Sequence, residues 1–204
     1  MHYSILYLHM LTTEFSVVEK TITHRRSIKP SNFNNKKIND DDINRLLQLA
    51  HFAPNHGSTE PWLFKVYKND ALQNFCTAHA NLYKQNAGDD FMQSKYDKLA
   101  AMGNTASHLI IAIMQRGALP KIPVWEELAA VSCAVQNVLL GAESLGAAGF
   151  WSTGGMTTSN ALKNYLQLRE DDMVVGLLFL GYADHSSYVK QRHSSLSSKV
   201  EWML

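Results

Sequence analysis

Residues 125–148 have the most informative pattern in the sequence: Trp125-Glu-Glu-Leu-Ala-Ala-Val-Ser-Cys-Ala-Val-Gln-Asn-Val-Leu-Leu-Gly-Ala-Glu-Ser-Leu-Gly-Ala-Ala148. The larger apolar residues of this stretch recur at alternating spacings of three and four, which predicts one long helix; they are Leu128, Val131, Val135, Val138, Ala142 and Leu145. Such a helix spans about 30 Å. Alanine, leucine and cysteine cover much of its remaining circumference, so most of its faces have to be buried.

Two arrangements would bury this helix. Either the rest of the chain wraps around it, or a second subunit covers the face that the chain leaves free. The chain has 204 residues, of which 46% are hydrophobic and only 18% are charged, against about 25% charged in an average soluble domain. The low charge favours a subunit interface, but the pattern alone leaves both arrangements open.

Outside this helix, shorter patterns predict a mixed α and β chain. Strands are expected where aromatic, β-branched or fully apolar runs occur, at residues 62–67, 109–114 and 173–180. Helices are expected at residues 14–25, 40–53, 70–86, 90–105 and 160–168. No repeat or linker divides the chain, so residues 14–204 are expected to form one domain, preceded by residues 1–13 as an N-terminal extension.

Charge and cysteine content exclude several classes of protein. A net charge of +1 provides no overall basic field for nucleic acid. Cys76 and Cys133 cannot form a disulfide framework, so a reducing compartment, the cytoplasm, is expected. No window of about 18 residues is apolar and uncharged enough to predict a membrane span.

Several familiar motifs are incomplete. The glycines at residues 141 and 146 have phosphate-loop spacing without the Lys-Ser/Thr pair. Ser152 precedes a glycine, but Phe150 stands where a nucleophile elbow needs glycine, so a hydrolase built on Ser152 is a minor alternative. The histidines have no H-E-x-x-H or C-x-x-C companions, so no metal site is expected. The acidic pairs, among them Glu126–Glu127 and Asp171–Asp172, are interpreted as helix caps and solvated faces.

Three separated segments share one property, since each offers cations, hydroxyls or tight backbone to a planar, anionic ligand. They are Arg25-Arg26-Ser27-Ile28-Lys29, the loop at residues 55–62, and Gly149-Phe-Trp-Ser-Thr-Gly-Gly155. Late in the chain, Lys190-Gln191-Arg192 adds two cations. Taken singly, each has a plain structural reading: the two arginines suit a helix C-terminus, and the loop is a helix-to-strand connection.

Together and in this order, the segments resemble the FMN-dependent nitroreductase family, and most of all its short-chain subgroup. That family has R-[RH]-S-x-[KR] after a helix and then A-P-S-x-x-N-x-Q-P-W, which reads Ala53-Pro-Asn-His-Gly-Ser-Thr-Glu-Pro-Trp62 in this chain. The likeness continues through Trp125-Glu126 at the start of the Ala-rich helix, the G-x-W turn, the strand after it and the terminal K-x-R. It covers about residues 14–200.

The resemblance implies an α+β fold with three layers, in which helices flank a central mixed or antiparallel sheet. It also implies an intertwined homodimer that binds FMN at two sites between the subunits. NADH or NADPH would give a hydride to the flavin, which would pass it by a ping-pong mechanism to nitro compounds, quinones or similar electrophilic acceptors. Neither nucleic acid nor membrane is implied as a partner.

The family's flavin-binding positions fall on ten residues of this chain: Arg25, Arg26, Ser27, Lys29, His56, Trp151, Ser152, Thr153, Lys190 and Arg192. Arg25, Lys190 and Arg192 would bind the phosphate with charge-assisted hydrogen bonds. Lys29 would stabilise the negative charge that develops on reduced flavin, and Ser27 would donate to pyrimidine or ribityl oxygens.

His56 would reach the flavin from the opposite subunit, and residues 151–153 would line the edge of the isoalloxazine ring. No catalytic residue is named, because flavin N5 itself carries the hydride. Ser58 and Glu60 depart from the family's Asn and Gln, and Ser152 stands where the subgroup often has Arg. A carboxylate beside reduced flavin is unfavourable, so the role of Glu60 is open. The alternative function is flavin storage or a scaffold on this fold without NAD(P)H turnover.

Overall fold

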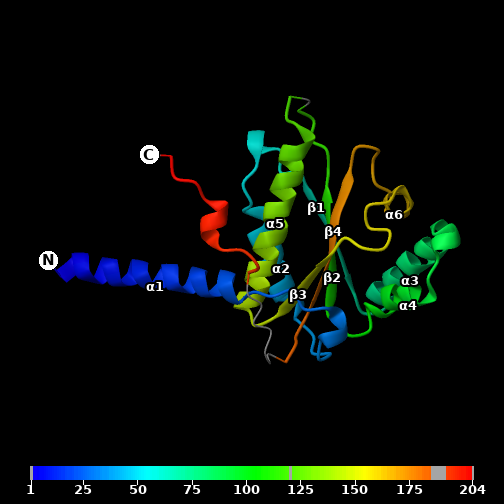
Figure 1. Cartoon of the computed structure of the whole chain (residues 1–204), viewed down its shortest axis with the longest axis horizontal. Coiled ribbons are helices and arrows are strands. Elements are labelled where there is room, and N and C mark those ends of the chain that lie inside the picture. The colour runs from blue at the N-terminus through cyan, green and yellow to red at the C-terminus, as the bar shows by residue number, and fades with distance from the viewer. Residues whose placement is uncertain (1, 120, 185–191, 204) are drawn as a thin grey trace.

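A four-stranded antiparallel sheet forms the middle of the molecule (Figure 1). The structure is a computed structural model that describes residues 2–119, 121–184 and 192–203, with side chains from residue 13 onward. The strands are β1 (Trp62–Lys68), β2 (His108–Met114), β3 (Ala148–Ser152) and β4 (Met173–Gly181), in the order β1-β2-β4-β3. The two central strands are the fully apolar runs of the sequence, because helices cover both of their faces.

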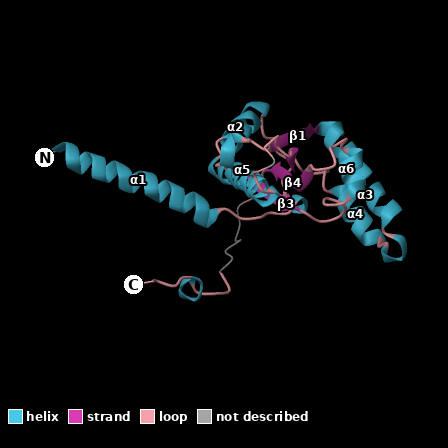
Figure 2. Cartoon of the chain, turned by 90° about the horizontal axis from the view of Figure 1, so that it is seen from above, coloured by secondary structure: helices cyan, strands magenta, loops and turns pink. Residues whose placement is uncertain are grey.

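Helices form a layer on each side of this sheet (Figures 1 and 2). One layer contains α2 (Asp40–His51) and α5 (Val124–Ser144), and the other contains α3 (Asn69–Asn86), α4 (Gln93–Ala101) and α6 (Asn160–Tyr165). Strand β2 serves both layers by simple alternation: Ile110 and Ala112 pack toward α5, whereas Leu109 and Ile111 pack toward α3. The expected α+β fold in three layers is confirmed, and the sheet is antiparallel.

Among the described residues, short 3₁₀ helices lie in the connections at Pro30–Asn32, His56–Ser58 and Gly88–Asp90, and another lies in the C-terminal segment at Leu196–Lys199. The three predicted strands agree with β1, β2 and β4 to within a residue. Asn39 caps α2 as expected, since its Oδ1 accepts a hydrogen bond of 2.7 Å from the Asp42 N–H.

Strand β3 is the element that the sequence pattern missed. It is five residues long and contains Gly149, which disfavours a strand assignment. A Cβ at this glycine would lie 2.7 Å from Leu139 Cδ2, so the residue permits β3 to run close against α5. The long helix also ends at Ser144 and not at residue 148, because Gly146 adopts the left-handed conformation (φ +70°) typical of a helix C-terminus.

Helix α1 (His2–His24) extends away from the body of the protein (Figure 2). Residues 2–13, expected as a separate extension, continue the same helix as residues 14–24. Phe15, Val18 and Ile22 follow one another at helical spacing, and all three are exposed. The C-terminal segment 192–203 also leaves the body and carries the exposed side chains of Leu196, Trp202 and Met203.

Helix α5 is covered by its own chain on only part of its circumference. Val131, Val135 and Val138 are fully buried against the sheet and α2. Trp125, with 67% of its surface exposed, begins an uncovered stripe, which continues through Ala129, Cys133 and Gln136. One chain by itself therefore leaves this stripe of the helix uncovered.

Candidate functional site

The first and third of the three segments lie side by side. Chain leaving α1 runs next to β3, where Ser27 and Gly149 form an isolated parallel bridge. The Ile28 N–H donates to the Gly149 carbonyl at 3.1 Å. Ile28 is buried, whereas Ser27 and Lys29 on either side of it are exposed. The R-R-S-x-K segment thus presents its serine and lysine on the open side of this bridge.

The two arginines that precede this bridge differ in their contacts. Arg26 Nη1 donates to the Thr23 and Arg25 carbonyls, at 2.6 and 2.9 Å, so its guanidinium is engaged at the C-terminal end of α1, where a cation is favourable. The half-buried Arg25 guanidinium makes no hydrogen bond or ion pair with any residue that the structure describes. Of the pair, Arg25 is the one left available to an anionic ligand.

The segment after β3 is held from the side of α3 by a buried histidine. His79 Nε2 accepts a hydrogen bond of 2.9 Å from the Met156 N–H. Gly155 has a left-handed conformation (φ +68°), and a Cβ there would lie 2.8 Å from His79 Cε1. Burial lowers the pKa of His79 to about 4, so the ring is a neutral acceptor near pH 7. Sequence reasoning missed His79, although it lies four residues after Phe75 and four before Tyr83 on the buried side of α3.

Within that segment the three expected flavin contacts have different environments. Trp151 is half-buried on the α2 and α5 side of the sheet, and its Nε1–H donates to the Val175 carbonyl at 3.2 Å. Ser152 is half-buried and Thr153 is exposed. The Trp151 indole is therefore a support of this sheet edge, and the polar groups offered to a ligand are those of Ser152, Thr153 and the backbone that follows.

His56, in the second segment, lies away from the other two. Its Nδ1 is 2.6 Å from Oε2 of Glu126, in the first turn of α5. The Ser27–Gly149 bridge lies just beyond the other end of α5, and a helix of its 21 residues is about 30 Å long. Figure 1 shows α5 running beside the sheet, across the direction of α1. One chain brings together two of the three segments, and the third lies at the opposite end of the helix.

The backbone around His56 is tightly constrained. Gly57 has a φ of +64°, and a Cβ at this position would lie 3.3 Å from Ile122 and 3.4 Å from Leu119. Ser58 and Glu60 also have positive φ values, of 50° and 42°, which are unfavourable for residues with side chains. The Glu60 side chain is exposed and its N–H donates to Asn55 Oδ1.

Of the two cations expected near the C-terminus, Lys190 and Arg192, the structure describes only one. Lys190 lies outside the described residues. Arg192 is exposed at the start of the C-terminal segment. Their expected partnership with Arg25 at a phosphate therefore stays a prediction.

The interpretation of two acidic pairs as solvated is wrong for one member of each. Glu127 and Asp172 are both 99% buried. Arg116 Nη1 is paired with Glu127, and Arg169 forms two hydrogen bonds of 2.8 and 3.1 Å with Asp172 Oδ1. Burial raises the pKa of Asp172, but the hydrogen bonds from Arg169 and Arg116 outweigh it and leave that pKa below its ordinary value. The pairs lock together the segments after β2 and before β4.

Ser107, His108 and Asp40 are connected in the same sequence as a Ser-His-Asp hydrolase triad, but they cannot act as one. Ser107 Oγ lies 2.9 Å from His108 Nδ1, and His108 Nε2 lies 3.2 Å from Asp40 Oδ1. Ser107 is buried, and its Oγ accepts a hydrogen bond from the Ile38 N–H, so it cannot meet a substrate as a nucleophile does. The set anchors the start of α2 to β2. No hydrogen bond joins Ser152 to a histidine among the described residues, which leaves the hydrolase alternative without support.

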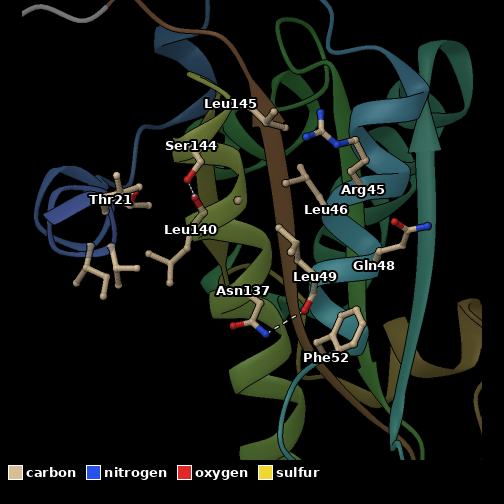
Figure 3. A pocket seen from close by; sticks show the side chains of 14 residues that line it. Thr21, Arg45, Leu46, Gln48, Leu49, Phe52, Asn137, Leu140, Ser144 and Leu145 are labelled. Atoms are coloured by element: carbon tan, nitrogen blue, oxygen red, sulfur yellow. Dashed lines mark hydrogen bonds between the residues drawn. The ribbon is translucent and has the colours of Figure 1, made fainter. Parts of the chain in front are cut away.

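An open groove of about 610 Å³ lies between α1, α2 and α5 (Figure 3). Its lining is mainly apolar and includes Val18, Ile22, Leu49, Phe52 and Leu140. Of the predicted flavin-binding residues that the structure describes, none lines it. Over the described ranges, no group of three potential metal ligands occurs, and no helix there has both the length and the apolarity to cross a membrane.

Comparison with known proteins agrees with the fold. The model of the "Nitroreductase family" matches residues 22–182. The chain belongs to the nitroreductase family, a family of oxidoreductases. A curated relative is YdjA of Escherichia coli K12, whose name places it among NAD(P)H nitroreductases; it is 27% identical over 141 residues, which are 69% of this chain and 75% of YdjA.

Solved structures show the same architecture. A nitroreductase-like protein of Bacillus cereus superposes with a TM-score of 0.76 and 26% identity, over 91% of this chain and 95% of that protein. A nitroreductase of Bacteroides fragilis with bound FMN has a TM-score of 0.68 and 23% identity, over 92% and 98% of the two chains. The second likeness, at this low identity, establishes the fold alone.

Proposed function

We propose that this protein is an FMN-dependent oxidoreductase that takes a hydride from NADH or NADPH and passes it to nitro compounds, quinones or similar electrophilic acceptors. The observation that carries the proposal is the Ser27–Gly149 bridge, which sets the R-R-S-x-K segment against the G-F-W-S-T-G-G segment. The name of the YdjA relative and the FMN bound to the Bacteroides fragilis protein support it.

The residues around this bridge suit an anionic flavin. The Arg25 guanidinium, without a partner among the described residues, would bind the phosphate together with Lys190 and Arg192. Lys29 and Ser27 are exposed beside the bridge and would face the negatively charged edge of the ring. When bound, the flavin supplies the hydride chemistry, so the residues of this chain bind and orient it and exclude water.

A second copy of the chain would complete this site. The uncovered stripe of α5, the apolar side of α1 and the groove in Figure 3 are contiguous surfaces that one chain leaves open. Covering them in a two-fold homodimer would bury apolar area. It would also let His56 of one subunit approach the Ser27–Gly149 bridge of the other, which a single chain keeps apart. Two unpaired cysteines, Cys76 and Cys133, agree with a cytoplasmic location.

The experiment that tests the proposal is direct. The purified protein is expected to be yellow, or to become so with FMN, and to oxidise NADH or NADPH when a quinone or a nitroarene is added. A protein that binds no FMN overturns the proposal. A protein that binds FMN and oxidises neither nucleotide with any acceptor would be a flavin-storing or scaffold protein on this fold.

A further inference from the structure

The contact between His56 and Glu126 joins two residues separated by 70 positions in the sequence. Sequence reasoning treats Glu126 as a member of a solvated acidic pair. In the structure its side chain is only 24% exposed, whereas the His56 side chain is 63% exposed. A largely covered carboxylate thus holds a largely uncovered imidazole by one of its two nitrogens.

The carboxylate decides which nitrogen of His56 carries the proton. A carboxylate only accepts hydrogen bonds, so Nδ1 has to donate to Glu126 Oε2. In the neutral ring the lone pair is then on Nε2. Nε2 lies on the far side of the ring from Glu126 and has no hydrogen-bond partner among the described residues. The second nitrogen of a histidine is commonly fixed in this way by a carboxylate when the first has a functional partner.

The surrounding backbone keeps this arrangement rigid. His56 precedes the left-handed Gly57, which packs against Ile122 and Leu119. Thr59 Oγ1 donates to the His56 carbonyl at 3.3 Å. An exposed histidine held at its ring and at its backbone has already lost most of the conformational freedom that binding would otherwise cost.

We propose that Glu126 is a positioning residue that fixes His56 as the Nδ1–H tautomer and presents Nε2 as a hydrogen-bond acceptor to an N–H or O–H group of the flavin bound by the partner subunit. This inference rests on the proposed function, because the flavin site belongs to it. Glu126 itself touches neither flavin nor substrate, and its effect passes through His56.

The test measures FMN affinity of the flavin-free protein by fluorescence titration in a double-mutant cycle. Glu126→Gln is expected to weaken binding about 5-fold, the value of one net hydrogen bond, and His56→Ala at least as much. In the His56→Ala background, Glu126→Gln is expected to cost nothing further, because the two residues act as one unit. Glu170→Gln, an exposed carboxylate before β4, is the matched control and should leave affinity unchanged.

A second measurement separates positioning from general stabilisation. The ¹⁵N spectrum of the histidine rings in the flavin-free protein is expected to show His56 as the Nδ1–H tautomer, and Glu126→Gln should shift it toward Nε2–H. Titration with lumiflavin, which lacks the ribityl chain, identifies the flavin group that donates to His56 Nε2. If Glu126→Gln weakens lumiflavin binding as much as FMN binding, the donor is a ring N–H. If it leaves lumiflavin binding unchanged, the donor is a ribityl hydroxyl.

The outcomes are distinguishable. If the wild-type protein binds no FMN, the proposed function and this inference both fail. If FMN binds and Glu126→Gln has wild-type affinity, or loses the same factor with and without His56, the assignment of Glu126 alone is overturned. An Nε2–H tautomer in the wild-type protein also overturns it.

Discussion

At the scale of single residues, the structure separates cations that the sequence could only group together. Arg25 and Arg26 are adjacent and of one type, yet Arg26 is bonded to carbonyls at the end of α1 and Arg25 is not. Both residues follow the end of α1 at His24, so the difference is in their side-chain contacts. Of these two residues, Arg25 is the one whose guanidinium is open to a phosphate.

Replacing Arg25 therefore tests the phosphate site. Arg25→Ala is expected to weaken FMN binding by about 10- to 100-fold, since it removes a charge-assisted hydrogen bond. Arg25→Lys should be intermediate, because lysine keeps the charge and loses the planar fork. Equilibrium titration with FMN measures the effect, and Lys84→Ala, on the exposed end of α3, is the control. Unchanged affinity in Arg25→Ala would refute the assignment.

The buried His79 predicts that the stability of the protein depends on pH. Its pKa is about 4 in the folded protein and about 6.5 in the unfolded chain. Above pH 6.5 the ring is neutral in both states and costs nothing. Between pH 6.5 and 4 only the unfolded state takes up the proton. The free energy of unfolding therefore decreases as the pH is lowered through this range, by up to about 3 kcal/mol.

Urea unfolding at several pH values measures this loss. His79→Gln keeps an acceptor for the Met156 N–H without the titration, so the wild-type protein should lose more stability than the variant as pH falls. Carboxylates titrate in both proteins and cancel in the comparison. Equal losses in the two would contradict the prediction.

At the scale of elements, the contact between β3 and β4 depends on one glycine. An added Cβ at Gly176 of β4 would clash with the indole of Trp151, whose Nε1–H bonds to the Val175 carbonyl. The half-buried Trp151 packs against the hydrophobic cluster that the sheet forms with α5. Gly176 thus determines where the edge strand, and the segment after it, can lie.

Gly176→Ala is therefore expected to destabilise the protein by about 1–3 kcal/mol, the usual cost of overpacking. Urea unfolding followed by tryptophan fluorescence measures it. Gly154→Ala is a matched control, because the nearest atom to its Cβ would be Ser152 Oγ at 3.9 Å and its φ is not positive. A Gly176→Ala protein as stable as the control would show that Trp151 moves without cost.

At the scale of the whole molecule, the uncovered face of α5 predicts association. Sedimentation is expected to find a dimer, and the double variant Ala129→Arg and Cys133→Arg, which puts two charges on that face, is expected to be monomeric and to bind FMN weakly. Thr77→Arg, on the exposed side of α3 in the other layer, should remain a dimer. A monomeric wild-type protein would refute both the dimer and the shared site.

Much of the fold follows from local pattern. The fully apolar runs at β2 and β4, the Asn39 cap of α2 and the 3–4 spacing in α5 depend on neighbouring residues, and each predicted its element. Strand β3 does not follow, because its identity depends on Gly149 fitting against Leu139 and on pairing with β4. Burial of Glu127 likewise depends on Arg116, which follows β2, and buried Asp172 accepts from the Arg116 N–H as well as from its neighbour Arg169.

The class of fold, the order of the motifs and the resemblance to nitroreductases follow from residue types and their spacing along the chain. Which motifs meet depends on the tertiary structure. It joined residues 25–29 to β3, put His56 on Glu126 at the other end of α5, and left one face of that helix uncovered. The physical reason is that a helix of about 30 Å holds its two ends apart, and spacing along a sequence does not record that separation.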